Sequence, residues 1–262
     1  LLDRAIATEP RDGSARLARA EIQMVRGNLD KARADCIALS LGVDTRHGIL
    51  CVAALSFRRG DDRAAANLID RWLQHTHTDD PQRRFALLMR GETASRGGET
   101  DAGRWFNAAL AIDRDDVRTL AAYVRHLRRR GRHADIVALL KDAPDTDALH
   151  LQHTLAAQAL QLPQAAGMSA AQGRRYALAH SLGVQPELRD EADYLLTLRK
   201  DPRAALALAQ QNFATQRDHE DVELMQRTSA AAGTPAAMRP VERWAASQQL
   251  ALTAASTAPS PP

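Results

Sequence analysis

The chain has 262 residues and a formal net charge of +3, from 35 Lys and Arg against 32 Asp and Glu. Alanine and leucine supply 51 and 33 residues, whereas aromatic residues make up only 4%, and this balance excludes a sheet-centred fold because strands favour β-branched and aromatic residues. No run of 18 apolar residues occurs, so the sequence contains no candidate membrane span.

Residues 1–12 have the pattern of the end of a helix, with Pro10 as its stop. The chain begins without methionine and inside this helical pattern. We therefore expect the first repeat to be truncated, with a native N-terminus and any targeting segment lying before residue 1.

A repeated unit follows, in which a glycine precedes a short polar pair and then small or apolar residues at fixed offsets. The residues five, nine and twelve positions after the glycine fall on one helical face, because steps of four and three each approximate one turn. Another apolar-periodic segment precedes each glycine, so each unit is predicted to be a helix, a tight turn and a second helix. The unit glycines, spaced by 33, 37 and 34 residues, are Gly27, Gly60, Gly97 and Gly131.

The pattern continues less regularly beyond the fourth unit. Residues 147–162 and 169–182 are predicted to form one further helix pair, and later turns are expected at Lys200 and Gly233. The sequence thus predicts an all-α array of about seven helix pairs over residues 1–250. Residues 251–262, which are rich in Ala, Ser and Pro, are expected to form a flexible tail.

The segments FNAALAIDRDD (106–116) and LLDRAIATEPRD (1–12) resemble the second helix and the acidic exit of the tetratricopeptide repeat (TPR) family. This resemblance implies an α-α superhelix that acts as a non-catalytic scaffold and binds a protein or peptide in its concave groove. The first helices of the family's repeats line that groove. When the groove-facing positions of the family are transferred to this chain by helical phase, they predict a partner-binding set of His47, Leu50, Phe57, Arg84, Arg118, Arg125 and Arg128.

In this interpretation the groove arginines bind carboxylates through their planar fork of donors, and Leu50 and Phe57 are apolar anchors. Residues 205–221 resemble exported bacterial repeat proteins, which favours an exported or periplasmic location over a cytoplasmic one. An array cut within a repeat exposes an apolar end, so self-association is also expected to be feasible.

Two cysteines, Cys36 and Cys51, lie fifteen residues apart in apolar helical stretches. If these helices are neighbours, a disulfide can form, and it would imply an oxidising compartment. The alternative is a pair of small buried thiols that do not react. The sequence leaves both interpretations open.

The basic run at residues 125–133 supplies the alternative function, nucleic-acid binding through phosphate contacts. Cations at the C-terminal end of a helix also stabilise its dipole, and no aromatic residue interleaves with these arginines to stack on bases. We therefore rank nucleic acid below a protein partner.

No pattern in the sequence indicates an enzyme or a cofactor. The phosphate-loop, GxGxxG and GxSxG motifs are absent, and paired acids such as Asp61-Asp62 lie where they cap helices. The pair His150 and His153 lacks the further ligands that a zinc site needs. We accordingly expect no catalytic residue, cofactor or metal.

Overall fold

The computed structural model describes residues 1–252, and within them the chain forms helices and no strand. A lone helix, α1, is followed by seven consecutive helix pairs, as the repeat pattern predicted. From residue 253 on, the predicted tail lies outside the described residues. The α-helices are α1 Leu2–Thr8, α2 Gly13–Val25, α3 Leu29–Ala38, α4 Thr45–Arg58, α5 Asp62–His75, α6 Arg83–Arg96, α7 Ala102–Ile112, α8 Val117–Arg129, α9 His133–Leu140, α10 Asp147–Ala159, α11 Ala165–Ser181, α12 Leu188–Thr197, α13 Pro202–Thr215, α14 His219–Ala231 and α15 Arg239–Ser247, with a π-helical turn at Leu39–Val43 and a 3-10 helix at Pro235–Met238.

Each of the seven turns within a pair contains one residue in the left-handed conformation, which ends the first helix and reverses the chain. In the third pair this residue is Gly98, with φ of 75°, whereas Gly97 keeps a helical φ of −69°, so the expected turn position was one residue too early. Two of the turns use a residue other than glycine, which explains why the sequence pattern faded in the second half of the chain. The seven residues are Gly27, Gly60, Gly98, Gly131, Gln161, Lys200 and Gly233.

Small residues let neighbouring helices approach closely inside the array. Gly91 of α6 faces the ring of Phe106 of α7, and a Cβ at position 91 would lie 2.8 Å from that ring. Phe106 is fully buried and stacks on Tyr123 of α8, with ring centroids 5.1 Å apart. The contact therefore joins one pair to the next, as stacking in a solenoid requires.

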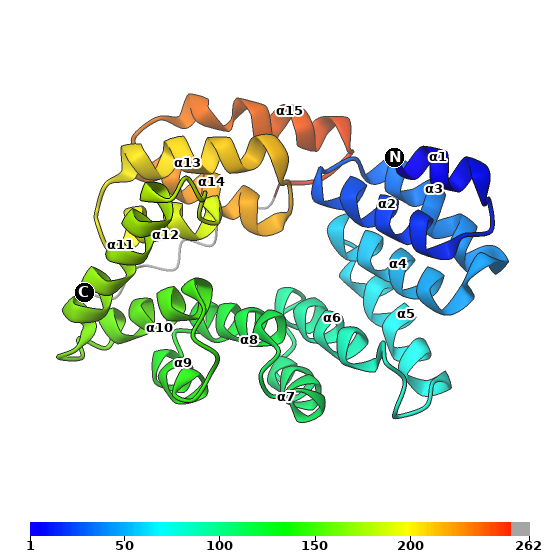
Figure 1. Ribbon diagram of the computed structural model, residues 1–262, viewed down its shortest axis with the longest axis horizontal. Helices are drawn as coiled ribbons and strands as arrows, with labels where there is room; N and C mark the ends of the chain where they lie inside the picture. The colour runs from blue at the N-terminus through cyan, green and yellow to red at the C-terminus, as the bar shows by residue number, and fades with distance from the viewer. Residues whose placement is uncertain (253–262) are drawn as a thin grey trace.

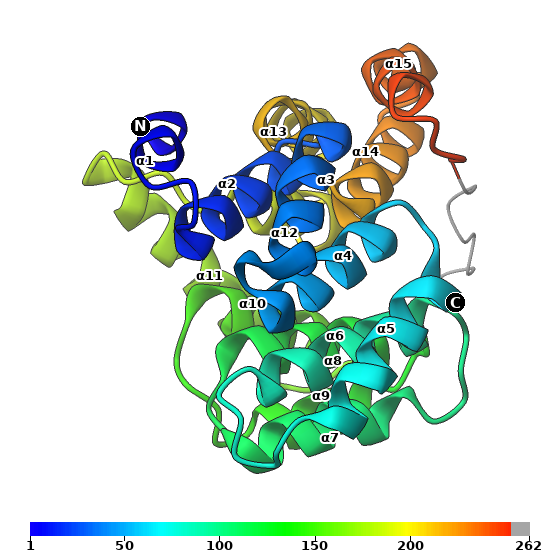
Figure 2. The same cartoon turned by 90° about the vertical axis from the view of Figure 1, so that its right-hand side faces the viewer.

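The helix pairs follow one another around a ring (Figure 1). Helices α2–α5 form one side, and the chain continues through α6–α10 and α11–α12 before α13–α15 return to the N-terminal pair. Along α6–α10 the first helix of each pair lies toward the inside and α7 and α9 lie outside. Figure 2, turned by 90°, places the N-terminal helices in front of the C-terminal ones.

Three hydrogen bonds join the two ends of this ring at the turn between α2 and α3. The backbone N–H of Arg217 donates to the carbonyl of Val25 at 2.8 Å, and the indole Nε1 of Trp244 donates to the carbonyl of Gly27 at 3.0 Å. The N–H of Leu29, which begins α3, donates to the side chain of Gln248 at 3.0 Å. The superhelix therefore closes on itself and is not an open groove.

Candidate functional site on the inner face

Charged side chains from first helices of distant pairs meet on the inside of the ring. Their helices are α4, α6, α8, α12 and α14, which the sequence places far apart and the ring brings together. We call this group the inner charged cluster. Its members are Arg58, Glu92, Arg125, Arg128, Arg189, Asp193, Asp218, Glu220, Asp221 and Arg227.

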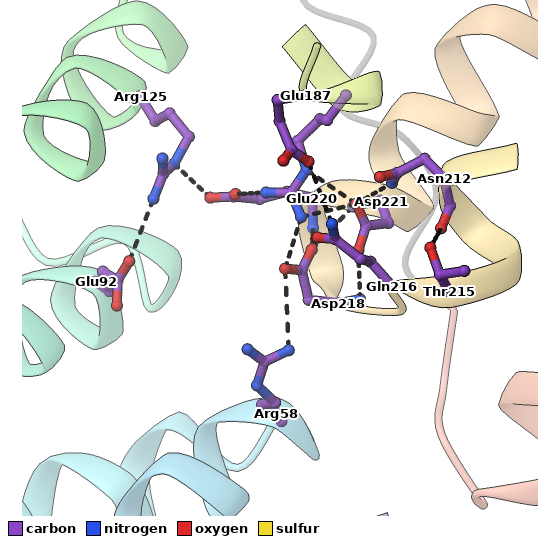
Figure 3. Close-up of polar contacts among 11 residues, drawn as sticks. Arg58, Glu92, Arg125, Glu187, Asn212, Thr215, Gln216, Asp218, Glu220 and Asp221 are labelled. Atoms are coloured by element: carbon purple, nitrogen blue, oxygen red, sulfur yellow. Dashed lines mark hydrogen bonds and ion pairs between the residues drawn. The ribbon is translucent and has the colours of Figure 1, made fainter. Parts of the chain in front are cut away.

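Arg125 bridges three helices within the cluster (Figure 3). Its guanidinium, on α8, lies 3.3 Å from the carboxylate of Glu92 on α6 and 2.5 Å from that of Glu220 on α14. Burial raises the pKa of Glu92, and the charge of Arg125 works against that rise. Arg125 is thus neutralised by carboxylates of its own chain.

The N-terminal end of α14 carries the acidic part of the cluster. Asp218 and Asp221 form a reciprocal capping box there, each side chain accepting a bond from the other's backbone N–H. Arg189 of α12 donates to both and also to Glu220, at distances of 2.9, 2.9 and 2.5 Å. Arg58 of α4 reaches Asp218 from across the ring at 3.9 Å, as Figure 3 shows. The sequence signal for this feature is the acidic start of α14, and nothing in the sequence links it to the arginines of other helices.

The buried carboxylate of Asp193 on α12 forms ion pairs with two arginines. It lies 2.6 Å from Arg128 of α8 and 2.7 Å from Arg227 of α14, and Asp193 is 5% exposed. Burial alone would raise the pKa of Asp193, but the two arginines outweigh burial and hold the pKa well below its usual range.

We expect Asp193→Asn to lower the free energy of unfolding at pH 7 by about 1.5–3 kcal/mol, because charge-assisted hydrogen bonds to both arginines are weakened. The folded-state pKa of Asp193 is depressed, so its stabilisation is present above the unfolded pKa and is lost as the pH falls below about 4. Urea unfolding of both proteins at pH 7 and near pH 3 should therefore give a difference that shrinks in acid. The exposed Asp142 supplies the control Asp142→Asn, and equal losses at positions 193 and 142 would contradict the expectation.

The structure brings Arg125 and Arg128 of the predicted partner-binding set together on the inner face, both paired with carboxylates. Arg84 lies 2.5 Å from Asp116, the N-cap of α8. Arg118 is exposed, and its Cζ lies 5.0 Å from the centroid of the Phe85 ring.

The N-terminal members of that set are engaged locally. Nδ1 of His47 lies 2.6 Å from the carboxylate of Asp44, and the ring of Phe57 is covered by Arg96, whose Cζ is 3.6 Å from the ring centroid. Leu50, expected to be an apolar anchor for a partner, is 3% exposed. That expectation was wrong, because α4 packs against both α5 and α6, and Leu50 joins a core with their side chains Ile69, Trp72, Ala86 and Met89.

The two cysteines lie on the neighbouring helices α3 and α4. The structure joins Cys36 and Cys51 in a disulfide, with Cα atoms 5.2 Å apart, and both residues are buried. The redox state of the two thiols in the native protein stays a prediction.

Other site classes have little support among residues 1–252. No three His, Cys, Asp or Glu side chains gather there in a way that could hold a metal ion. Nδ1 of His150 instead lies 2.7 Å from the side-chain oxygen of Gln172. None of the described helices has both the length and the apolar character needed to cross a membrane.

Comparisons with known proteins bear on the fold. No family model and no curated protein matches the sequence. Among solved structures, the chain is similar to a tetratricopeptide repeat protein from Parabacteroides merdae, with a TM-score of 0.52 and 18% sequence identity over 87% of this chain and 89% of that one. The chain therefore has a TPR-like all-α superhelical fold, which confirms the resemblance inferred from its repeats.

Proposed function

We propose that the chain is a non-catalytic scaffold that binds an acidic segment of a protein or peptide on the inner face of the array, at Arg118. The observation that carries this proposal is that the guanidinium of Arg118 is both accessible and unpaired. It is exposed and has no hydrogen-bond or ion-pair partner among the described residues. Its contact with Phe85 fixes a cation over an aromatic face.

The remaining arginines of the predicted set explain why Arg118 is singled out. Arg84, Arg125 and Arg128 already bind carboxylates of this chain, so an added acidic partner would have to displace Asp116, Glu220 or Asp193. Arg118 needs no such exchange. Arg84 of α6 meets Asp116 at the N-terminal end of α8, two residues before Arg118, so Arg118 lies next to a member of the predicted set that is already paired.

No specific observation favours nucleic-acid binding through residues 125–133. The folded chain divides this run, because Arg125 and Arg128 pair with carboxylates on the inside while Arg130 and Arg132 lie beside α7 on the outside. A continuous basic track for a phosphate backbone is therefore not formed.

The proposal is tested by probing an array of acidic, neutral and basic peptides with the wild-type protein and with Arg118→Glu. We expect the wild type to retain acidic peptides and the variant to lose them, because the new carboxylate repels them. Arg33→Glu makes the same charge change at another exposed arginine and should keep binding. Equal binding by both variants, or retention of single-stranded RNA and DNA in place of peptides, would overturn the proposal.

Self-association through the N-terminal end stays a separate prediction. Leu1, Ile22 and Val25 are exposed at that end, beside the turn that closes the ring. Sedimentation velocity over a range of protein concentrations would reveal a dimer.

A further inference from the structure

A pocket of about 430 Å³ opens on the outer side of the array, between the start of α7, the end of α8 and the turn into α9. Three arginines line it: Arg104, Arg130 and Arg132. Asp101 supplies the carboxylate among its lining residues. The pocket lies across α8 from the inner charged cluster and does not depend on the function proposed for Arg118.

Each guanidinium is held in place by contacts with its own chain. Arg132 lies 2.7 Å from Asp135, and Arg104 lies 3.4 Å from Asp101 and packs over the ring of Trp105. Arg130 donates to the backbone carbonyl of Glu99 at 3.1 Å. Among the described residues Arg130 has no carboxylate partner, so its positive charge is left uncompensated beside the pocket.

Neutral donors surround the same space. Asn107 and the hydroxyl of Tyr123 line the pocket, and that hydroxyl has no hydrogen-bond partner among the described residues. Gly103, in the first turn of α7, also lines it; the side chain of the N-cap Asp101 makes no capping bond, and among residues 1–252 only the N–H of Arg104 in that turn is bonded, to the carbonyl of Asp101 at 3.3 Å. The other N–H groups of that turn and the positive end of the helix dipole favour an anion.

His126 of α8 also lines the pocket and can report on its occupancy. It is 4% exposed, yet it lines the pocket, and its Nδ1 lies 2.8 Å from the hydroxyl of Ser95. Its Nε2 has no partner among the described residues. Burial, together with the charges of Arg130, Arg129 and Arg132, lowers the pKa of His126 to about 4, so the ring is neutral at pH 7 in a strongly positive field.

We propose that this pocket binds a phosphate monoester whose phosphoryl oxygens meet the unpaired Arg130, while Arg104 and Arg132 share their several N–H donors between the phosphoryl group and the carboxylates of Asp101 and Asp135. Guanidinium forks match phosphate oxygens in geometry and charge, and three arginines line this pocket. A volume of about 430 Å³ suits one phosphorylated group with a small organic body, and it does not provide the long track that a nucleic acid requires.

The test is an NMR titration of the His126 ring, assigned with the variant His126→Gln, using O-phosphoserine, inorganic phosphate, serine and a short single-stranded DNA as probes. We expect O-phosphoserine to shift the His126 resonances and to raise the pKa of His126, since a bound dianion offsets the surrounding cations. Serine should leave both unchanged. Binding of inorganic phosphate as tight as that of O-phosphoserine would show that the phosphoryl group alone is recognised, which also supports the site.

Variants separate a specific site from general attraction to a basic protein. The double variant Arg130→Gln and Arg132→Gln changes two exposed residues and should weaken O-phosphoserine binding by at least about tenfold. Arg33→Gln should leave it unchanged. No response of His126 to millimolar O-phosphoserine, an equal loss in both variants, or tighter binding of the DNA at the same residues would overturn the proposal.

Discussion

Replacing Gly27 with alanine is expected to open the ring. Gly27 has a φ of 72°, and a Cβ there would lie 2.5 Å from Nε1 of Trp244 and 2.9 Å from Cβ of Arg217. The same indole nitrogen donates to the carbonyl of Gly27, so the added methyl group and this closing bond cannot coexist. Displacing Trp244 also separates its ring from that of Phe213, now 5.7 Å away between centroids.

The left-handed conformation costs an alanine about 1–2 kcal/mol, and loss of a packed tryptophan costs about 3–5 kcal/mol. We therefore expect the free energy of unfolding of Gly27→Ala to fall by at least about 3 kcal/mol. Small-angle scattering should record a larger radius of gyration, and hydrogen exchange should accelerate in the α2–α3 turn and in α15.

Gly60 provides a matched control for this experiment. Its φ is 81° and it ends the first helix of a pair in the same way, but within residues 1–252 no atom other than those of its chain neighbours lies within 4 Å of the position of its Cβ. Gly60→Ala should lower the free energy of unfolding only by the cost of the left-handed backbone conformation, and it should keep the radius of gyration of the wild type. Equal changes in both variants would mean that the closing contact does not hold the ring together.

Removing the disulfide with the double variant Cys36→Ser and Cys51→Ser is expected to lower the free energy of unfolding by about 3 kcal/mol. The bond closes a loop of fifteen residues, and the chain-entropy model assigns about this value to a loop of that length. Guanidinium unfolding of wild type and variant, each with and without reductant, measures the effect. Reductant should destabilise the wild type and leave the variant unchanged.

Mass spectrometry of protein purified without reductant provides the accompanying check. A mass two hydrogens below that of the reduced chain is expected, and free thiols at both cysteines would contradict the disulfide. Disulfides persist mainly in oxidising compartments, so an intact bond would also support the exported location inferred from residues 205–221.

The regular turns show how far local sequence signals reach. Gly27, Gly60 and Gly131 mark turns by their residue type, because glycine takes a positive φ at little steric cost. Gln161 and Lys200 adopt the same conformation with φ of 53° and 57°, although neither residue type favours a positive φ. In the second half of the array the repeat spacing predicts the turns at Lys200 and Gly233, whereas no sequence signal predicts the turn at Gln161.

On the inner face, helical phase alone does not predict which side chains are paired or buried. Helical phase puts Arg125 and Arg128 on one face of their helix, but it cannot reveal that Glu220 and Asp193 neutralise them. Phase also failed for Leu50, because a first helix packed against two neighbours buries more than one of its faces. Asp193 had no recognisable motif, since its importance comes from two arginines on other helices.

The sequence by itself determined the helices, their pairing every thirty to forty residues and the small residues between them, because these depend on contacts between near neighbours along the chain. The tertiary structure alone decided that the array closes, that its groove arginines meet carboxylates of their own chain and that a basic pocket forms on the outside. Small rotations between successive pairs add up around the ring, and their sum is not contained in any one repeat.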